Sequence, residues 1–110
     1  MAAPANSFCA FRPLITLLGR RHTMEILYAV FTDNPARFTD LQRRTGINPR
    51  TLTDRLRELS GSGILSRRAY REIPPRVEYR LTEKGLALGR MFEGLERWYE
   101  RYGTKGSWPP

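Results

Sequence analysis

The stretch IPPRVEYRLTEKG, residues 73–85, carries the strongest fold signal in the chain. Apolar and polar residues alternate from Val77 to Leu81, which is the period expected of a strand with one buried face. Pro74 and Pro75 hold fixed φ angles, so they predict a stiff tip in front of that strand. Thr82 then supplies the side-chain oxygen that a helix N-cap needs. The stretch predicts a rigid tip, a strand and the start of a helix.

A second strand-like run, ILSRRAYRE at residues 64–72, precedes the tip, so the two runs predict a β-hairpin joined by residues 73–76. An amphipathic helix is predicted before this hairpin. Leu52, Leu56 and Leu59 recur at helical spacing and form one apolar stripe. Asn48 and Pro49 begin the helix with a capping side chain and a residue that needs no backbone donor. Glycines at positions 61 and 63 end it.

A shorter helix is predicted at residues 39–45, with Thr39 as its N-cap and a turn at Gly46 and Ile47 behind it. Two helices joined by a glycine turn, the second with a polar outer face, form the helix-turn-helix pattern. The hairpin that follows makes the pattern a winged helix.

Three further helices complete the prediction. Two precede the helix-turn-helix, at residues 11–18 and 23–31, and one long helix runs from Thr82 to Tyr102 with apolar residues at the helical period. The predicted fold class is mainly α with a small β-hairpin, a winged helix-turn-helix in one domain that spans residues 8–102. Residues 1–7 are expected to form a flexible arm and residues 103–110 a flexible tail.

The charge of the chain indicates a polyanionic partner. Lys and Arg number 19 against 11 Asp and Glu, which gives a formal net charge of +8. Nucleic acid is the first candidate, because nearly all the cations are arginine, whose planar fork suits phosphates and guanine edges. A generally basic, soluble surface is the alternative. No apolar run is long enough to span a membrane and the start lacks the pattern of a signal peptide, so we expect a cytoplasmic protein with no membrane partner.

The outer face of the helix that begins at Pro49 is the predicted centre of DNA recognition. Arg50 is suited to guanine, Thr51 to a methyl group or a phosphate, and Asp54 to the cytosine amino group. Arginines around the hairpin are suited to the backbone or the minor groove. The alternative is an ordinary amphipathic helix with a solvated face, on which Arg50 and Asp54 pair with each other. The residues expected to contact DNA are Arg37, Thr39, Asn48, Arg50, Thr51, Asp54, Arg55, Arg57, Arg67, Arg71 and Arg76.

The residue types that most catalytic sites need are scarce. His22 is the only histidine, so neither a histidine-based metal cluster nor a Ser-His-Asp triad can be assembled within one chain. The sequence contains no Gly-rich phosphate loop and no CxxC motif. We therefore predict no enzyme activity, no catalytic residue, no metal and no cofactor.

The segment from residue 37 to residue 85 resembles the HxlR family of bacterial winged-helix transcription regulators, which are relatives of the MarR regulators. The resemblance rests on an RF pair, a GI turn, an LxxRLxxL helix and a PPRVEYxLTxxG wing, at Arg37, Gly46, Leu52–Leu59 and Pro74–Gly85. With Cys9 and Trp98 it extends over residues 8–99. Family members usually carry Gly-Lys-Trp between the first two helices, where this chain has Gly19, Arg20, Arg21 and His22.

The resemblance implies a homodimer formed by the N- and C-terminal helices, with two recognition helices in successive major grooves of a pseudo-palindromic operator. The final helix also carries more apolar surface than so small a domain needs to bury by itself. The alternative is that this face closes over the core of the monomer. The expected interface residues are Leu14, Leu17, Met91, Phe92, Leu95, Trp98, Tyr99 and Tyr102. A winged-helix accessory factor that binds protein or RNA remains the alternative function.

Cys9 is the single cysteine, so an internal disulfide is excluded. Arg12 lies near it and a helix begins close by, and both features favour the reactive thiolate. Several regulators of the HxlR type use such a cysteine as a sensor, so the resemblance implies an oxidant or small-molecule effector. The sensing form would be an intersubunit disulfide, a mixed disulfide or an adduct. An unreactive cysteine at the dimer interface is the alternative.

Overall fold

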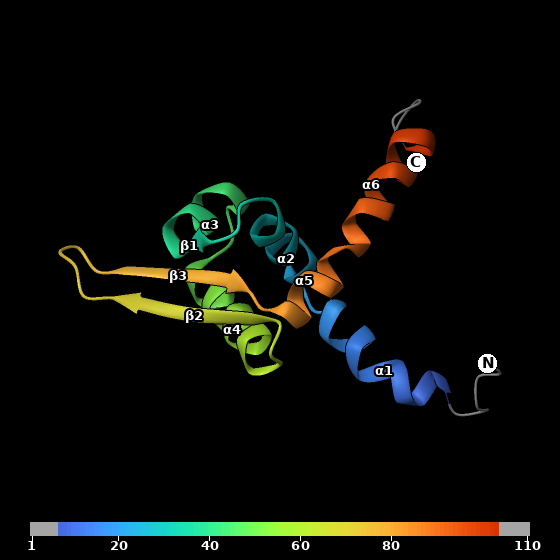
Figure 1. Cartoon of the computed structure of the whole chain (residues 1–110), viewed down its shortest axis with the longest axis horizontal. Coiled ribbons are helices and arrows are strands. Elements are labelled where there is room, and N and C mark those ends of the chain that lie inside the picture. Colours follow the sequence, from blue (N-terminus) through green and yellow to red (C-terminus); the bar gives the residue numbers. More distant parts are fainter. Residues whose placement is uncertain (1–6, 104–110) are drawn as a thin grey trace.

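Six helices and three short strands make up residues 7–103, which are the residues described by this computed structural model, with side chains described from Ala10 onward. In chain order the elements are α1 (Ser7–Leu18), α2 (Thr23–Thr32), β1 (Ala36–Arg37), α3 (Phe38–Thr45), α4 (Pro49–Gly61), β2 (Leu65–Tyr70), β3 (Arg76–Leu81), α5 (Glu83–Gly89) and α6 (Met91–Tyr102). Figure 1 shows α2, α3, α4 and α5 gathered around the base of the sheet, with the hairpin projecting on one side and α1 and α6 on the other. This is a winged helix.

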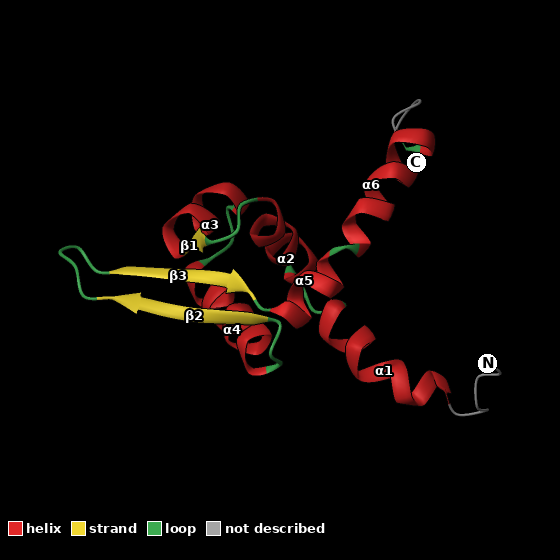
Figure 2. Ribbon diagram, viewed as in Figure 1, coloured by secondary structure: helices red, strands yellow, loops and turns green. Residues whose placement is uncertain are grey.

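The sheet has the order β1-β3-β2, and both pairings are antiparallel (Figure 2). Leu65 pairs with Leu81 at the base of the hairpin, and Tyr70 pairs with Arg76 near its tip. Tyr79 and Leu81 are buried and Arg80 between them is exposed, as the period of two predicted, whereas Arg76, Val77 and Glu78 are all half-buried. The hairpin is confirmed, although β2 is shorter than the predicted run and leaves residues 71–75 as the tip.

The helix-turn-helix follows the sequence signals closely. Gly46 ends α3 in the left-handed region (φ 68°), and its N–H donates to the carbonyl of Gln42 at 2.8 Å. Ile47 plugs the turn at 5% exposure. The side chain of Asn48 accepts a hydrogen bond from the Arg50 N–H at 2.8 Å, so the predicted cap of α4 is confirmed.

The core lies beneath the helix-turn-helix and the base of the hairpin. The predicted α4 stripe of Leu52, Leu56 and Leu59 is completely buried. It packs with α2, α3 and the sheet in one apolar cluster. Thr82 caps α5 as predicted, because its hydroxyl accepts from the Gly85 N–H at 3.0 Å. These contacts fix α4 against the base of the hairpin.

The prediction of one long final helix was wrong, because the chain turns at Arg90 and forms α5 and α6 separately. The turn lets two neighbouring positions pack on α2. A Cβ atom at Gly89 would lie 2.6 Å from the Phe31 ring, so only glycine allows this approach. The Phe92 ring lies 5.0 Å from the Tyr28 ring and 5.7 Å from the Phe31 ring.

Three smaller differences concern the N-cap of α3, the strand β1 and the start of α1. Thr39 was wrongly predicted as the N-cap of α3; Arg37 holds that position, because the chain enters the helix directly from β1. The strand β1 itself was not predicted. Helix α1 begins at Ser7 rather than Phe11. The rest of the expected arm and all of the expected tail beyond Gly103 lie outside the described residues. Within the described part, no helix has the length and apolar character needed to cross a membrane.

Candidate nucleic-acid interface

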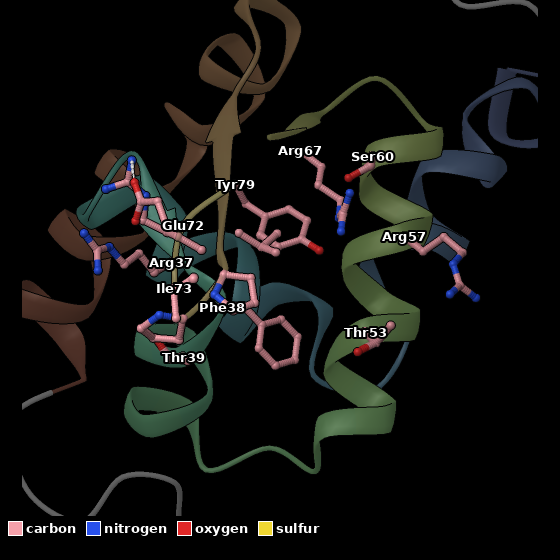
Figure 3. Close-up of a pocket in the computed structure, with 14 residues that line it drawn as sticks. Arg37, Phe38, Thr39, Thr53, Arg57, Ser60, Arg67, Glu72, Ile73 and Tyr79 are labelled. Atoms are coloured by element: carbon pink, nitrogen blue, oxygen red, sulfur yellow. Dashed lines mark ion pairs between the residues drawn. The ribbon is translucent and has the colours of Figure 1, made fainter. Parts of the chain in front are cut away.

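A groove of about 790 Å³ lies between α3, α4 and the hairpin (Figure 3). We call it the α4–hairpin groove. Its lining residues are Arg37, Phe38, Thr39, Thr53, Arg57, Ser60, Arg67, Glu72, Ile73, Pro74, Pro75, Arg76, Val77 and Tyr79. The groove therefore brings together five of the residues predicted to contact DNA, from the five elements β1, α3, α4, β2 and β3: Arg37, Thr39, Arg57, Arg67 and Arg76.

The groove combines aromatic walls with cationic side chains. In Figure 3 the Arg67 and Tyr79 side chains extend from the hairpin toward α4, the Phe38 ring lies between α3 and α4, and Arg57 points outward from α4. Tyr79 is 6% exposed, so its ring serves as a wall of the groove rather than a free surface group. Arginine beside aromatic surface is a common arrangement for contact with phosphates and sugars.

Several of the arginines predicted to contact DNA, inside and beside the groove, have no internal carboxylate partner. Among the described residues, Arg37, Arg50, Arg67 and Arg71 form no ion pair with a carboxylate, and all four are exposed. An arginine without an internal carboxylate partner keeps its full charge and all its donors for an external anion. The basic surface is thus available to a phosphate backbone.

The outer face of α4 presents Arg50 and Asp54 to solvent, while Thr51 is half-buried. Asp54 lies 3.9 Å from Arg57 rather than against Arg50, so the surface pair considered as an alternative does not form. Asn48 is exposed, but its side-chain oxygen is engaged in the α4 cap. Thr53 was not predicted, although it stands three residues after Arg50 and four before Arg57 and so shares their face.

Arg55 points inward, away from the groove. Its side chain is 15% exposed, its Nε donates to the carbonyl of Arg21 at 2.9 Å, and its Nη1 lies 3.3 Å from Glu58. Glu58 also pairs with Arg20 at 3.1 Å. Arg55 therefore ties α4 to the turn between α1 and α2. Its spacing of three from Leu52 and four from Leu59, on the edge of the apolar stripe, is the signal that could have indicated this role.

Arg76 is held within the hairpin by a group of side chains that we call the Tyr70 cluster: Arg68, Tyr70, Glu72, Arg76 and Glu78. The Arg76 guanidinium lies 3.9 Å from the Tyr70 ring centre and 3.1 Å from Glu72. Its Nε is 3.7 Å from Glu78, which is an ion pair but too long for a hydrogen bond. The Tyr70 hydroxyl donates to Glu78 at 3.1 Å, and Arg68 lies over the same ring. Arg76 is therefore only 24% exposed.

The residues predicted for a dimer interface divide into two groups. Leu95, Trp98, Tyr99 and Tyr102 are 41–56% exposed along α6. Phe92 is 5% exposed and belongs to the core, where Met91 and Leu17 also pack, while Leu14 is half-buried. On α1, Phe11 and Ile15 are 56% and 43% exposed, and neither was predicted.

The position of α6 is fixed by Tyr28 on α2. The Tyr28 hydroxyl donates to Glu96 at 3.1 Å. That hydrogen bond, followed by burial and by the charge of Glu96, raises the pKa of Tyr28 above the usual tyrosine value. This hydrogen bond links α6 to α2, while the apolar faces of α1 and α6 stay exposed.

Cys9 lies in the helical backbone of α1, but its side chain is outside the described residues. A second hollow of about 920 Å³ lies between α1, the end of α4 and α5. Arg12 and Pro13, which follow Cys9 by about one helical turn, line this hollow. His22 pairs with Glu25 at 3.2 Å, and no group of three potential metal ligands occurs among the residues whose placement is described.

The family description "HxlR-like helix-turn-helix" matches residues 17–107. This chain belongs to the HxlR family. A transcriptional regulator of the helix-turn-helix type from Halalkalibacterium halodurans is 39% identical over 85 residues, which cover 76% of this chain and 75% of the relative. The regulator YodB of Bacillus subtilis is 33% identical over 103 residues, covering 92% of this chain and 91% of YodB. The HxlR assignment makes this chain a transcriptional regulator.

Solved structures agree with the HxlR assignment. The reduced form of YodB superposes with a TM-score of 0.72 at 31% identity, covering 97% of this chain and all of the YodB chain. YodB has also been solved after diamide treatment and with bound quinone. A structure from Enterococcus faecalis, described as a regulator of the MarR family, has a TM-score of 0.75 at 31% identity and covers 94% of each chain. The predicted resemblance to the HxlR and MarR regulators is confirmed.

Proposed function

We propose that this HxlR-family chain is a cytoplasmic, homodimeric regulator that binds a pseudo-palindromic DNA operator. Helix α4 enters the major groove, and the hairpin contacts the backbone or the minor groove. The observation that carries the proposal is the α4–hairpin groove, where exposed arginines of β1, α4 and β2 surround one concave surface. A duplex that meets α4 therefore meets the start of α3 and the hairpin at the same time.

The contact set is narrower than the sequence predicted. We retain Arg37, Thr39, Arg50, Thr51, Asp54, Arg57, Arg67 and Arg71. Asn48 and Arg76 are assigned to holding α4 and the hairpin in shape, because their polar groups are engaged internally. Arg55 is assigned to the contact between α4 and the α1–α2 turn. Arg50 is the base-reading candidate, while Arg37 and Arg67 hold the phosphates on either side of it.

The test is selection of duplexes from a random pool, followed by affinity measurements at several salt concentrations. We expect Arg50→Ala to cost about 1–3 kcal/mol and to relax preference at one base pair. Arg67→Ala is expected to weaken all duplexes alike and to reduce the salt slope by about one unit. Arg90→Ala removes an equally exposed arginine far from the groove and should change neither quantity. An equal loss of duplex affinity in all three variants would mean that binding reflects only general charge attraction. Tighter binding to RNA than to duplex DNA would favour the accessory-factor alternative.

The exposed apolar faces of α1 and α6 support dimerisation. Phe11, Ile15, Leu95 and Tyr102 are 43–56% exposed, which is costly for side chains that contact only water. We expect Leu95→Glu to convert the dimer to a monomer in sedimentation experiments and to abolish binding to a two-half-site duplex. Ala69→Glu places the same charge on an exposed hairpin position and should leave the dimer intact. A dimer that survives Leu95→Glu and Phe11→Glu together would refute this interface.

Cys9 is the proposed sensor of an oxidant or electrophile. The support is the reduced, diamide-treated and quinone-bound forms of the related YodB, together with the hollow that Arg12 lines one turn after Cys9. A quinone or diamide is expected to lower operator affinity in the wild type and to have no effect on Cys9→Ser. A response that persists in Cys9→Ser would show that the input enters elsewhere.

A further inference from the structure

Ile73 stands at the tip of the hairpin with its side chain completely in solvent, at 102% exposure. A single exposed apolar side chain is ordinary on a protein surface and by itself indicates nothing. Ile73 differs in its position, because it lies in the tip between β2 and β3, on a hairpin that projects from the body (Figure 1). It contributes nothing to the core, so its apolar character has no role in folding.

The tip that carries Ile73 is fixed in shape. Pro74 and Pro75 follow it directly, and the proline ring allows little rotation about φ. Behind the tip, Arg76 is clamped between the Tyr70 ring and Glu72, which lies only one residue before Ile73. An apolar side chain presented on a rigid support loses little conformational entropy when it meets a partner.

The charges around the tip are balanced in a way that suits a polyanion. Arg76 of the Tyr70 cluster pairs with both Glu72 and Glu78, and Arg68 lies over the Tyr70 ring in the same cluster, so the two acidic residues next to the tip have cationic neighbours within the hairpin. Arg71, two residues before Ile73, is exposed and has no ion pair within residues 7–103. The tip therefore presents Ile73, next to two exposed prolines, beside one available cation.

Ile73 also faces the same partner as α4. It is among the residues that line the α4–hairpin groove, at the hairpin-tip end, together with Arg37, Arg57 and Arg67. A duplex that occupies the outer face of α4 through its major groove presents its flanking minor groove to the hairpin. The minor groove is about 6 Å wide, and its walls are apolar sugar rings flanked by phosphates.

We infer that Ile73 enters the minor groove that flanks each half-site and makes apolar contact with the sugar rings there, while Arg71 pairs with the adjacent phosphate. This inference rests on the proposed function and adds a residue that selects sequence outside the α4 contacts. The guanine amino group projects into the minor groove, and an apolar side chain cannot satisfy it. The hairpin therefore favours A·T pairs at the flanking positions.

The experiment uses the full chain and a duplex that the wild type has enriched from a random pool. A duplex of about 30 base pairs is long enough for two half-sites and both flanks. Ile73→Ser is expected to weaken binding about tenfold by loss of buried apolar surface, and Ile73→Val to retain most of the affinity. Leu86→Ser, an exposed apolar position on α5 away from the groove, serves as the matched control and should bind like the wild type.

Flanking base pairs supply the second readout. The wild type should bind duplexes with A·T or inosine·C flanks about equally, and G·C flanks about fivefold more weakly, because only guanine carries the minor-groove amino group. Ile73→Ser should lose this discrimination. Unchanged affinity of Ile73→Ser, with Arg50→Ala still impaired, would overturn the inference and leave the proposed function standing. Weaker binding without flank dependence would equally overturn the minor-groove assignment. If neither Ile73→Ser nor Arg50→Ala changes the affinity for the duplex, the proposed function itself has failed.

Discussion

Gly85 provides the sharpest test of how the hairpin is anchored to the helices. It is buried at the start of α5, where a Cβ atom would overlap the carbonyl oxygen of Ile64 and lie 3.1 Å from the Leu81 side chain. These neighbours are backbone and core atoms, so α5 itself has to move when Gly85 is replaced by alanine. The movement pulls Thr82 away from Ile64, whose carbonyl accepts from both the N–H and the hydroxyl of Thr82 at 3.1 Å.

The magnitude follows from three contributions. Overpacking costs about 1–3 kcal/mol. Weakening the two hydrogen bonds of Thr82 costs about 1 kcal/mol each. The better helix propensity of alanine returns about 1 kcal/mol. Gly85→Ala should therefore lower the free energy of unfolding by about 2–4 kcal/mol, which for a domain of this size lowers the melting temperature by roughly 10–25 °C.

Thermal and urea unfolding followed by circular dichroism measure this effect. Gly61→Ala is the matched control, because Gly61 is also helical but a Cβ atom there meets nothing within 4 Å. The control should be neutral or more stable by up to about 1 kcal/mol. A Gly85→Ala protein that melts within a few degrees of the Gly61→Ala protein would refute the packing of α5 on the hairpin base.

Three other predictions concern residues that position the site. Phe92→Ala should destabilise the fold by about 3–5 kcal/mol in urea unfolding; the same loss at low and high protein concentration would identify a core residue, and a loss confined to low concentration would identify an interface residue. Asn48→Ala should cost about 1 kcal/mol and Asn48→Ser should recover most of it in the same assay, because serine also caps helices; failure of serine to recover stability would rule out capping as the cause. The raised pKa of Tyr28 means that its hydrogen bond to Glu96 stabilises the fold below the ordinary tyrosine pKa and is lost as the pH rises through the folded-state value. Tyr28→Phe should therefore be less stable than the wild type near neutral pH, and the difference should begin to shrink above about pH 10; a difference that is constant from pH 7 to 11 would contradict this assignment.

The parts of the fold that the sequence predicted are those set by local chemistry. Asn48, Gly46 and Thr82 each cap or end a helix through a hydrogen bond to a residue within four positions, so these capping roles can be recognised without knowing the rest of the structure. The apolar stripe of α4 and the alternation of β3 are likewise periodic features of a short segment.

The parts that it missed depend on contacts between distant segments. The apolar period continues across Arg90, so nothing local indicates that the helix ends there; the turn follows from the packing of Gly89 and Phe92 on Phe31. The same holds for the candidate site. The exposed arginines of α4 were correctly placed on its outer face, but the engagement of Arg76 by Tyr70 and Glu72 depends on the exact geometry of the hairpin tip.

Strand β1 has only two residues, yet it constrains how the hairpin can be exchanged between relatives. Ala36 pairs with Tyr79 and Arg37 with Glu78, and the next residue, Phe38, already begins α3. The helix-turn-helix and the wing therefore share a backbone register as well as a surface. A hairpin grafted from another family member would have to arrive with a compatible segment at residues 36–38. The wing and the recognition unit are expected to diversify as one block rather than as interchangeable modules.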